Sequence, residues 1–411
     1  MIKIQQKCQV SNKADLKEII KLGRFVPVNN FQKSKKKSLI QKKYPLELMY
    51  SAKSKLIQIN CVLNKEIVFP KEYPYTSSTT KILRDNFLEL SKKIKQKIKL
   101  TYNDIVMDIG CNDGNLLKNF LDTSNTLGVS PEDIIKNAKK LGINTMQSYF
   151  DSITVNKILK KFGKIKVITA TNVFAHIDRT NELTKNITKC LHKNGIFVTE
   201  CHYADSVISG MQYDTIYHEH LRYYSLSSLN FLLEKHKLKI FDYEMIKTHG
   251  GSIRVYCCHN KNGKFKINKP KLNKLYKYEN KTLNKKNFNK FKIKVKKNKV
   301  EILKLLKKLS LKKKTVYGVG APSRASTLIN YCSLNSKFIK NILEIPGSYK
   351  INKYMPGTDI KVISENSGLA KKPDFLMLFS WHISNELIKS LKKKGFSGKF
   401  IIPLPKLKVV R

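Results

Sequence analysis

The sequence has few acidic residues and very few arginines. Its 411 residues include 80 Lys and Arg but only 30 Asp and Glu, which gives a formal net charge of +50. Seven of the 80 are Arg, the side chain that recognises bases and phosphates through paired hydrogen bonds. Because Lys, Asn and Ile are abundant together, the charge is more typical of codon bias in an A+T-rich genome than of a binding surface. We therefore expect no nucleic-acid partner.

The sequence also lacks long apolar runs and closely paired cysteines. No run approaches the roughly 20 apolar residues that span a bilayer, and the first residues do not resemble a secretion signal. Eight cysteines occur without a C-x-x-C pair, which suits neither a disulfide framework nor a zinc ribbon. These absences predict a cytoplasmic protein with reduced thiols and no membrane partner. The length predicts two or three domains.

Composition and periodicity divide the chain into four parts. Residues 1–80 are punctuated by prolines and predict a small, irregular N-terminal domain. Residues 81–260 alternate strand and helix signals, which predicts βαβ units around a parallel sheet. Residues 261–314 hold 22 Lys and two Glu beside an apolar stripe, which predicts a solvated helical connector. Residues 315–411 begin a second α/β unit, so the predicted fold class is α/β with two Rossmann-like domains.

The elements expected in these parts follow from short apolar runs and helical spacing. The predicted strands span residues 105–109, 126–129, 167–170, 195–200 and 315–318. The predicted helices span residues 85–99, 116–121, 131–141, 181–191 and 325–331.

Residues 105–117 carry a glycine-rich turn after a β-branched strand. Glycines let the backbone turn sharply and approach a ligand, and a helix start offers free N–H groups. The dinucleotide pattern G-x-G-x-x-G is absent from this turn. A tight structural turn would account for the glycines alone, but the strands and helices that follow favour the S-adenosylmethionine (SAM) loop of a methyltransferase. Asp108 would orient the turn and the methionine end of SAM.

Residues 213–225 concentrate polar, titratable and aromatic side chains. Histidine exchanges protons near neutral pH, and a neighbouring carboxylate or phenol can orient it. A metal site at His218 and His220 is an alternative, although no third ligand follows at motif spacing. A purely structural role for these histidines is also open.

Six segments resemble, in order, the sugar-nucleotide C-methyltransferases, SAM enzymes similar to those that place a methyl branch on C3 of dTDP-linked keto-hexoses. They are residues 108–114, 172–176, 217–225, 249–254, 318–331 and 399–403. The resemblance implies a small N-terminal domain that usually carries zinc, a central SAM-binding domain, and a C-terminal α/β domain that helps to hold a nucleotide sugar. It implies SAM as the cofactor and a nucleotide sugar as the substrate.

The resemblance also implies roles for individual residues. His220 would be the base, Tyr217 would anchor the keto or enolate oxygen, and Glu219 and His176 would support them. The implied cofactor contacts are Asp108, Gly110, Asn112, Asp113, Gly114, Ser130 and Asn172. The implied substrate contacts are Tyr75, Arg222, Arg254 and Arg324. Structural alternatives are a packed loop for Tyr75, a hairpin turn at Gly250 and Gly251 before Arg254, and an empty Rossmann turn before Arg324; for Trp381 we expect core packing.

Two positions depart from the family pattern. The usual zinc cysteines are replaced, because the chain has only Cys8 beside Ser11, Ser51 and Ser54. Serine is a poor zinc ligand, so we expect zinc to be absent and no metal to be bound. Ser130 stands where an acidic residue normally binds the ribose of SAM, so either SAM affinity is weakened or another residue such as Asp113 compensates.

Three functions follow as hypotheses. The leading one is an active C-methyltransferase acting next to the ketone of a nucleotide-linked 4-keto-deoxysugar. The charge leaves a nucleic-acid methyltransferase as an alternative, which predicts salt-sensitive binding. The lost cysteines and Ser130 leave a non-catalytic sugar-nucleotide-binding relic, against which the intact residues 217–220 argue.

Overall fold

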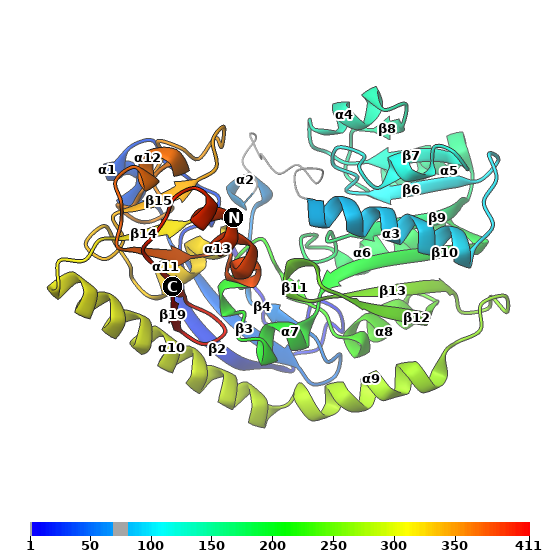
Figure 1. The fold of residues 1–411 in the computed structure, drawn as a ribbon. Coiled ribbons are helices and arrows are strands. Elements are labelled where there is room, and N and C mark those ends of the chain that lie inside the picture. The colour runs from blue at the N-terminus through cyan, green and yellow to red at the C-terminus, as the bar shows by residue number, and fades with distance from the viewer. Residues whose placement is uncertain (1, 69–80) are drawn as a thin grey trace.

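The computed structural model describes residues 2–68 and 81–411 and contains four β-sheets (Figure 1). Tyr75 lies outside the described residues. Figure 1 shows the sheet of the central part on one side, the sheet of the C-terminal part on the other, and two long helices running beneath both. No helix among the described residues is long and apolar enough to cross a membrane.

The N-terminal part is built on an antiparallel sheet of order β11-β4-β3-β2. Its strands are β2 (Leu16–Phe25), β3 (Tyr44–Ser51), β4 (Ile57–Ile59) and β11 (Arg222–Tyr223). A second, two-stranded sheet joins β1 (Ile2–Ile4) to β5 (Cys61–Leu63), and the short helices are α1 (Lys35–Leu39) and α2 (Lys65–Val68). The prediction of an irregular domain was wrong. In β3, buried residues Tyr44, Leu46 and Leu48 alternate with less buried ones, a two-residue period that an interpretation based on prolines overlooks.

The central sheet has seven strands in the order β12-β13-β10-β9-β6-β7-β8. The parallel strands are β6 (Ile105–Ile109), β7 (Asn125–Val129), β8 (Asn144–Met146), β9 (Ile165–Thr171) and β10 (Leu191–His202), and an antiparallel hairpin adds β12 (Leu238–Ile246) and β13 (Ser252–His259). The chain runs from β6 out to β8 and then returns to β9 on the other side of β6. This reversal of strand order creates the crevice in which open α/β sheets bind ligands.

The helices of the central part match two predicted ones, at residues 85–99 and 181–191, differ from two others, and include three that were not predicted, at residues 152–162, 204–209 and 226–235. They are α3 (Lys81–Lys97), α4 (Ile135–Lys140), α5 (Ser152–Phe162), α6 (Thr180–Cys190), α7 (Ala204–Ser209) and α8 (Leu226–Lys235), with short 3-10 turns η3 (Tyr213–Thr215) and η4 (Thr248–Gly250). The predicted α-helix after the SAM loop is instead the 3-10 turn η2 (Leu117–Phe120), because little chain separates Gly114 from β7. The helix predicted from residue 131 begins at Ile135, after a turn that contains Glu132.

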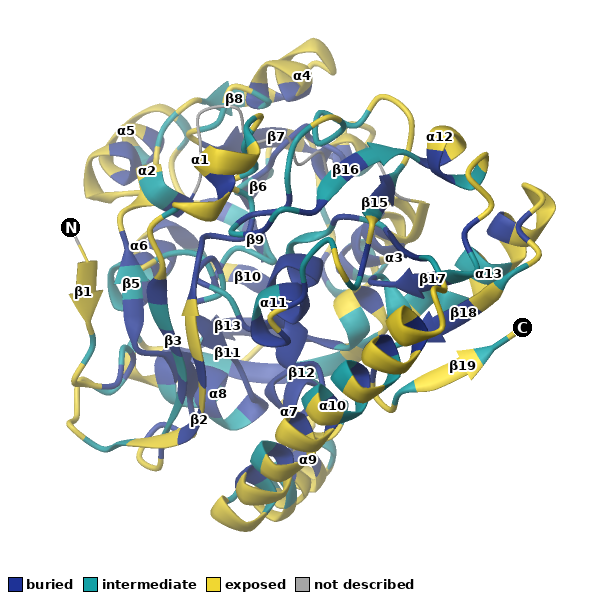
Figure 2. Cartoon of the chain, turned by 90° about the vertical axis from the view of Figure 1, so that its left-hand side faces the viewer, coloured by how far each residue is buried: buried dark blue, intermediate teal, exposed yellow. Residues whose placement is uncertain are grey.

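The connector consists of α9 (Lys269–Thr282) and α10 (Lys285–Leu311), as its apolar stripe predicts. Figure 2 shows α10 with buried residues facing the molecule and exposed ones facing outward. The C-terminal sheet then has the order β16-β15-β14-β17-β18-β19. Its strands are β14 (Val316–Val319), β15 (Asn341–Glu344), β16 (Lys361–Ser364), β17 (Phe375–Leu378), β18 (Lys399–Ile402) and the antiparallel edge strand β19 (Lys408–Val410). Its helices are α11 (Ser323–Tyr331), α12 (Glu365–Leu369), α13 (Ser384–Lys393) and the 3-10 turn η5 (Trp381–Ile383).

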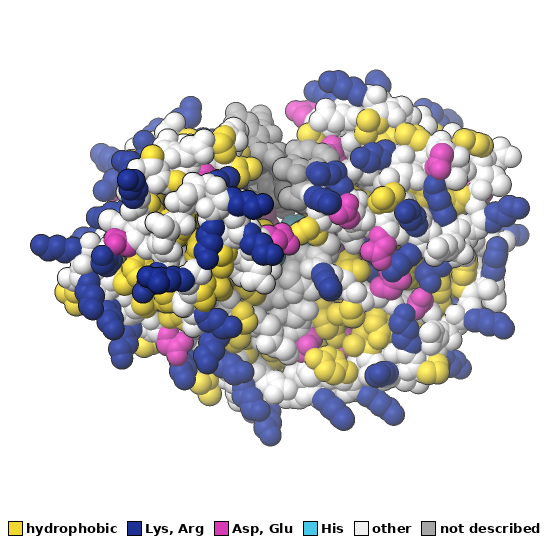
Figure 3. All heavy atoms as spheres, in the orientation of Figure 1, with side chains coloured by type: hydrophobic (Ala, Val, Ile, Leu, Met, Phe, Trp, Pro, Cys, Tyr) yellow, Lys and Arg dark blue, Asp and Glu magenta, His cyan; other side chains and the backbone are white. Residues whose placement is uncertain are grey.

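One apolar core joins the N-terminal and C-terminal parts. It contains Leu48 of β3, Ile216 of the central segment, Phe291 of α10 and Ile342 of β15, all buried. The central sheet packs its two faces into separate cores. Lysines, in contrast, are scattered over both halves of the surface seen in Figure 3 and do not gather into one patch there. The two parallel sheets with their crossover helices confirm the predicted fold class.

Candidate active site

The SAM loop leaves β6 at the switch point of the central sheet. Gly110 and Gly114 have φ angles of +74° and +80°, which glycine adopts without strain. A Cβ atom at Gly114 would lie 2.8 Å from the Cβ of Ala138 on α4, so the turn also requires the missing side chain. The N–H of Gly110 donates to the carbonyl of Val129 at 2.7 Å, which holds the loop against the end of β7.

Asp108 lies buried at the end of β6, beneath this loop. Its Oδ1 accepts a hydrogen bond of 2.6 Å from the Thr169 hydroxyl. Burial raises the pKa of Asp108 to about 7, an effect that the Thr169 hydrogen bond opposes.

The polar side chains implied as cofactor contacts meet at one edge of the sheet. Asn112 and Asp113 belong to the loop after β6, Ser130 follows β7, and Asn172 follows β9. Carboxyl ends of parallel strands at a switch point are where α/β sheets hold nucleotides. Positive-φ glycines, amides and carboxylates at this edge form a donor and acceptor set that fits SAM.

His220 is held by two hydrogen bonds that define which ring nitrogen carries its proton. The carbonyl of Thr215 lies 3.1 Å from Nδ1 and can only accept, so Nδ1 carries the hydrogen. Nε2 is therefore the basic nitrogen, and the Tyr217 hydroxyl donates to it at 3.1 Å. Burial holds the pKa of His220 well below its usual range, and the nearby His176 and His202 lower it further. The ring is thus a neutral base at neutral pH.

Other rings surround His220. The centroid of His176 lies 5.0 Å from that of His220, and those of Tyr223 and His202 lie 6.1 and 6.4 Å away. Burial lowers the pKa of His176 to about 4 and that of His202 to about 3. His202, which ends β10, is not among the site residues expected from the sequence. Its position at the carboxyl end of a strand beside the SAM-domain edge was the signal that could have identified it.

Glu219 connects the site to both flanking parts of the chain. Its carboxylate accepts a hydrogen bond of 2.7 Å from the side-chain amide of Asn29. Asn29 in turn accepts from the Ser323 hydroxyl at 3.3 Å, at the start of α11. His218 faces elsewhere, because its Nε2 donates to the carbonyl of Pro45 at 3.1 Å. His218 and His220 therefore do not share a ligand position.

The three arginines implied as substrate contacts are engaged in protein contacts. Arg222 is fully buried and donates to Gln9 at 2.6 Å and to the carbonyls of Ile177 and Asp178. Arg254 is also fully buried and pairs with Glu200 at 2.7 Å. The turn before Arg254 closes the hairpin of β12 and β13.

Arg324 forms a third internal contact, with Asp214 of the central segment. Its Nε lies 3.0 Å from Asp214 Oδ2, and a nitrogen of its guanidinium donates to His382 at 2.6 Å. Trp381 donates to the same Asp214 carboxylate at 2.7 Å, and the Arg324 guanidinium lies 4.9 Å from the Trp381 ring centroid. Trp381 therefore orients an ion pair between the central segment and the C-terminal part. Its half-buried ring also packs against the apolar core that joins the N-terminal and C-terminal parts, so the predicted core packing is confirmed, and the hydrogen bond of the indole N–H is the added feature.

The four positions of the zinc-type motif come together although only one is a cysteine. The Cys8 thiol lies 3.1 Å from the Ser54 hydroxyl, which donates to Ser51 at 3.0 Å. Burial would raise the pKa of Cys8, but hydrogen bonds from Ser11 and Ser54 lower it. One thiol and three hydroxyls do not fit a structural zinc ion. Among residues 2–68 and 81–411, no three His, Cys, Asp or Glu side chains are arranged to hold a metal.

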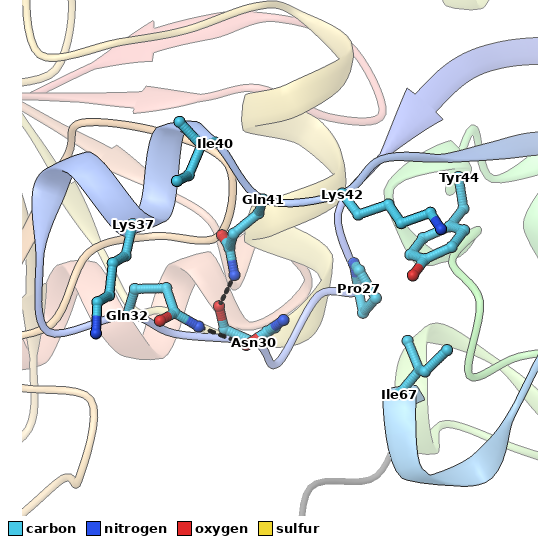
Figure 4. A pocket seen from close by; sticks show the side chains of 9 residues that line it. All are labelled: Pro27, Asn30, Gln32, Lys37, Ile40, Gln41, Lys42, Tyr44 and Ile67. Carbon is cyan, nitrogen blue, oxygen red and sulfur yellow. Dashed lines mark hydrogen bonds between the residues drawn. The ribbon is translucent and has the colours of Figure 1, made fainter.

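A pocket of about 320 Å³ opens in the N-terminal part (Figure 4). Figure 4 shows Lys42 and Tyr44 at one end and Lys37 at the other. Between them, Asn30 accepts hydrogen bonds from Gln32 at 2.7 Å and from Gln41 at 2.8 Å. The ring of Tyr44 lies 6.1 Å from that of His218, which places this pocket beside the segment that carries His220.

Three protein families match successive stretches of the chain. Residues 8–69 match the family described as "Putative zinc binding domain", residues 75–242 match "Methyltransferase domain", and residues 247–405 match "C-methyltransferase C-terminal domain". The chain is 25% identical to the C-methyltransferase NovU of Streptomyces niveus over 407 residues, which cover 98% of this chain and 96% of that protein.

Solved methyltransferase structures resemble the central part. A SAM-dependent methyltransferase from Clostridium acetobutylicum is 16% identical, with a TM-score of 0.35, covering 44% of this chain and 93% of its own. The magnesium protoporphyrin IX methyltransferase of Synechocystis with bound SAM is 10% identical, with a TM-score of 0.33, covering 43% and 79%. The three family matches, in order and over nearly the whole length, agree with the SAM loop and the ring cluster. The chain therefore carries the domains of a SAM-dependent C-methyltransferase.

Proposed function

We propose that this C-methyltransferase acts on a nucleotide-linked 4-keto-deoxysugar of the dTDP type and methylates the carbon next to its ketone. The observation that carries the proposal is the pair formed by His220 and Tyr217. A carbon next to a ketone becomes nucleophilic only after it loses a proton, so the site needs a base and a donor for the enolate oxygen. His220 Nε2 and the Tyr217 hydroxyl, 3.1 Å apart, supply these two functions side by side.

In the proposed reaction, the proton and the electron pair released from the carbon each have a defined acceptor. Nε2 of His220 takes the proton from the carbon, and the electron pair of the broken C–H bond moves toward the carbonyl oxygen. Tyr217 donates its O–H to that oxygen as negative charge develops. The Thr215 carbonyl keeps Nδ1 protonated throughout and thus keeps Nε2 aimed at the substrate. When bound, SAM supplies an electrophilic methyl group on a sulfonium, and positioning contributes most of the acceleration.

Glu219 and His176 act as positioning residues in this proposal. Glu219 is anchored by Asn29, so the segment carrying His220 is tied to the N-terminal part. His176 packs its ring edge against His220 at 5.0 Å and limits how that ring can turn. A neutral His176 also avoids placing a second positive charge beside His220 once the base has taken its proton.

The pocket beside Tyr44 suits the nucleotide end of the proposed substrate. Lys37 and Lys42 are cations for a diphosphate. The amides of Asn30 and Gln41 add hydrogen-bonding groups. The engaged state of Arg222, Arg254 and Arg324 supports these lysines as the phosphate contacts.

The proposal is tested by incubating the protein with SAM and a panel of 4-keto sugar nucleotides, with mass spectrometry of the products. We expect one member of the panel to gain the mass of one CH2 unit. In a His220→Asn variant turnover should fall by roughly 10²- to 10⁴-fold, the usual contribution of a general base.

Two control measurements accompany this experiment. The His220→Asn variant should bind S-adenosylhomocysteine as the parent does, and a His192→Asn variant, changed at the other end of β10, should retain turnover. If no sugar nucleotide on the panel gains mass, the substrate class is wrong. If His220→Asn keeps full turnover, His220 is not the base.

A further inference from the structure

The SAM site lacks a ribose carboxylate at the expected position. In Rossmann-like nucleotide sites an acidic residue about 20 residues after the first glycine accepts hydrogen bonds from the ribose hydroxyls. Twenty residues after Gly110 stands Ser130, buried at the end of β7. A serine hydroxyl is uncharged and makes weaker hydrogen bonds than a carboxylate does.

A carboxylate lies two residues further along, at Glu132. This residue stands in the turn between β7 and α4, where its carbonyl accepts from the N–H of Ile135 at 3.2 Å. The Asn112 side chain, in the SAM loop, hydrogen-bonds to the Glu132 carboxylate. The negative charge of Glu132 is also felt by the Cys111 thiol, whose pKa is raised chiefly by burial and further by Asp108 and Glu132. Glu132 therefore lies against the loop that would hold SAM.

The surroundings of Glu132 are unusual for an acidic residue in this chain. Basic residues outnumber acidic ones by 80 to 30, yet no described Lys or Arg pairs with Glu132. The side chain is half-buried, and burial raises the pKa of its carboxyl group. A partly desolvated carboxylate without a cation is stabilised by hydrogen-bond donors, and the two hydroxyls of a ribose are such donors.

Neighbouring acidic residues are less suited to this role. The side chain of Asp133 is 79% exposed, and its carboxylate contacts Lys136 and Gln147 on the surface. Asp113, a candidate from the sequence, accepts from the backbone N–H of Asn115 at 3.4 Å within its own turn. Of the two acidic residues in the turn after β7, Glu132 is the one that combines partial burial with a hydrogen bond to the SAM loop.

We propose that Glu132 replaces the missing acid at position 130 and accepts hydrogen bonds from the ribose hydroxyls of SAM. The inference rests on the cofactor site proposed above. It explains how a chain with Ser130 retains a SAM site: the carboxylate has moved two residues along the chain, from the strand end into the following turn.

Titration calorimetry with S-adenosylhomocysteine tests the proposal without requiring turnover. Glu132→Gln should weaken binding by roughly 10- to 100-fold, the effect of removing a charged hydrogen-bond acceptor. For the 2′,3′-dideoxy analogue, which lacks both hydroxyls, the same substitution should change affinity by less than about threefold. Asp133→Asn is the matched control and should bind both ligands as the parent does.

Moving the carboxylate back provides a rescue. The double variant Ser130→Asp, Glu132→Gln should recover affinity for S-adenosylhomocysteine to within about fivefold of the parent. Circular dichroism and thermal melting of each variant separate loss of the contact from loss of the fold.

The results separate a failure of the proposed ribose contact from a failure of the cofactor site as a whole. If the parent protein does not bind S-adenosylhomocysteine, the cofactor site itself is wrong. If the parent binds and Glu132→Gln binds equally well, or loses affinity equally for both ligands, Glu132 does not contact the ribose.

Discussion

At the scale of single residues, two hydrogen bonds from neighbouring residues set the orientation and the protonation of the His220 ring. Thr215 accepts from one nitrogen of His220, and Tyr217 donates to the other. The donated hydrogen bond stabilises the neutral ring, in the same direction as burial. The His220 ring is therefore a weaker base than a free imidazole, but near neutral pH it is present entirely in the neutral form that can accept a proton.

A Tyr217→Phe variant removes the donated hydrogen bond and should raise the pKa of His220. Activity is lost as pH falls through this pKa, so the acid limb of the turnover profile should move to higher pH. A hydrogen bond of about 1 kcal/mol corresponds to a movement of roughly 0.7 pH unit. Turnover should also fall, because the enolate oxygen loses its donor.

The measurement is turnover against pH for the parent, Tyr217→Phe and Tyr102→Phe. Tyr102 is exposed and donates to the Asp122 carbonyl away from the site, so its variant should keep the parent profile. An acid limb that stays in place in Tyr217→Phe would show that Tyr217 does not set the protonation of His220.

At the scale of elements, two loops of the N-terminal part keep the geometry of a zinc site without its ligands. The loop of residues 8–11 meets the loop of residues 51–54 through hydrogen bonds between Cys8, Ser51 and Ser54. The side chain of Asp15 extends this network, accepting from the Ser51 hydroxyl at 2.8 Å. Hydrogen bonds thus join two loops within the stretch that matches the family described as "Putative zinc binding domain".

Restoring the cysteines should create a zinc site. In a tetrahedral site of four cysteine thiolates, with Zn–S bonds of about 2.3 Å, the sulfur atoms lie roughly 3.8 Å apart. The Ser54 hydroxyl lies 3.1 Å from the Cys8 thiol and 3.0 Å from the Ser51 hydroxyl, so small movements of these three side chains would accommodate the ion. The triple variant Ser11→Cys, Ser51→Cys, Ser54→Cys should bind one zinc ion, and EDTA should lower its Tm by roughly 5 °C or more.

Elemental analysis and thermal melting with and without EDTA check this outcome. The parent protein and the triple alanine variant at the same three positions should contain no zinc and should melt independently of EDTA. Zinc in the purified parent would contradict the expectation that the remaining thiol cannot hold the ion.

A second element-scale feature is the buried ion pair between neighbouring strands. Arg254 of β13 contacts Glu200 of β10, and both side chains are fully buried. Asn86 of α3 donates to Glu200 at 3.0 Å and accepts from Arg254 at 2.9 Å, and Glu244 of β12 accepts from Arg254 at 2.9 Å. This network joins a helix to three neighbouring strands of the central sheet.

Arg254→Met should lower the free energy of unfolding by about 3 to 5 kcal/mol, because Glu200 is left buried without its cation. The control is Arg179→Met, whose exposed pair with Glu182 should contribute no more than about 1 kcal/mol. Urea unfolding of the two variants measures the difference. A stable Arg254→Met protein with a raised KM for the sugar nucleotide would instead make Arg254 a substrate contact.

At the scale of the whole molecule, the shared core and the net charge have opposite effects on the free energy of unfolding. The core that joins the N-terminal sheet, α10 and the C-terminal sheet buries apolar side chains from distant parts of the chain. The positive charges behind the formal net charge of +50 repel one another across the protein surface. We therefore expect the stability of the folded state to depend on ionic strength.

Raising the NaCl concentration from about 20 mM to about 300 mM shortens the screening length from roughly 20 Å to roughly 6 Å and should raise Tm by a few degrees. Thermal melting across this range checks the prediction, and KCl at equal ionic strength should act equally. A Tm that falls with salt would mean that attractive ion pairs outweigh the net repulsion.

Local features of the fold were predictable wherever neighbouring residues carry the signal. The strand at residues 105–109 was predicted with the bounds of β6, and the connector was predicted as helical. The strand β3 was missed because Pro45 obscured its alternation, and the turn η2 was mistaken for an α-helix because a helical pattern does not report how little chain is available. Glu132, which we propose as the ribose contact, was not considered because the carboxylate was expected at position 130, with Asp113 as its substitute.

The sequence by itself determined the strand before the SAM loop, its positive-φ glycines, and the segment in which Tyr217 and His220 meet, because these residues are close along the chain. Tertiary structure decided the rest. It added β11 to the N-terminal sheet, brought Asn29 to Glu219, and engaged the arginines in internal pairs. Contacts across such separations depend on how sheets and helices bury a common core, which no local pattern of residues specifies.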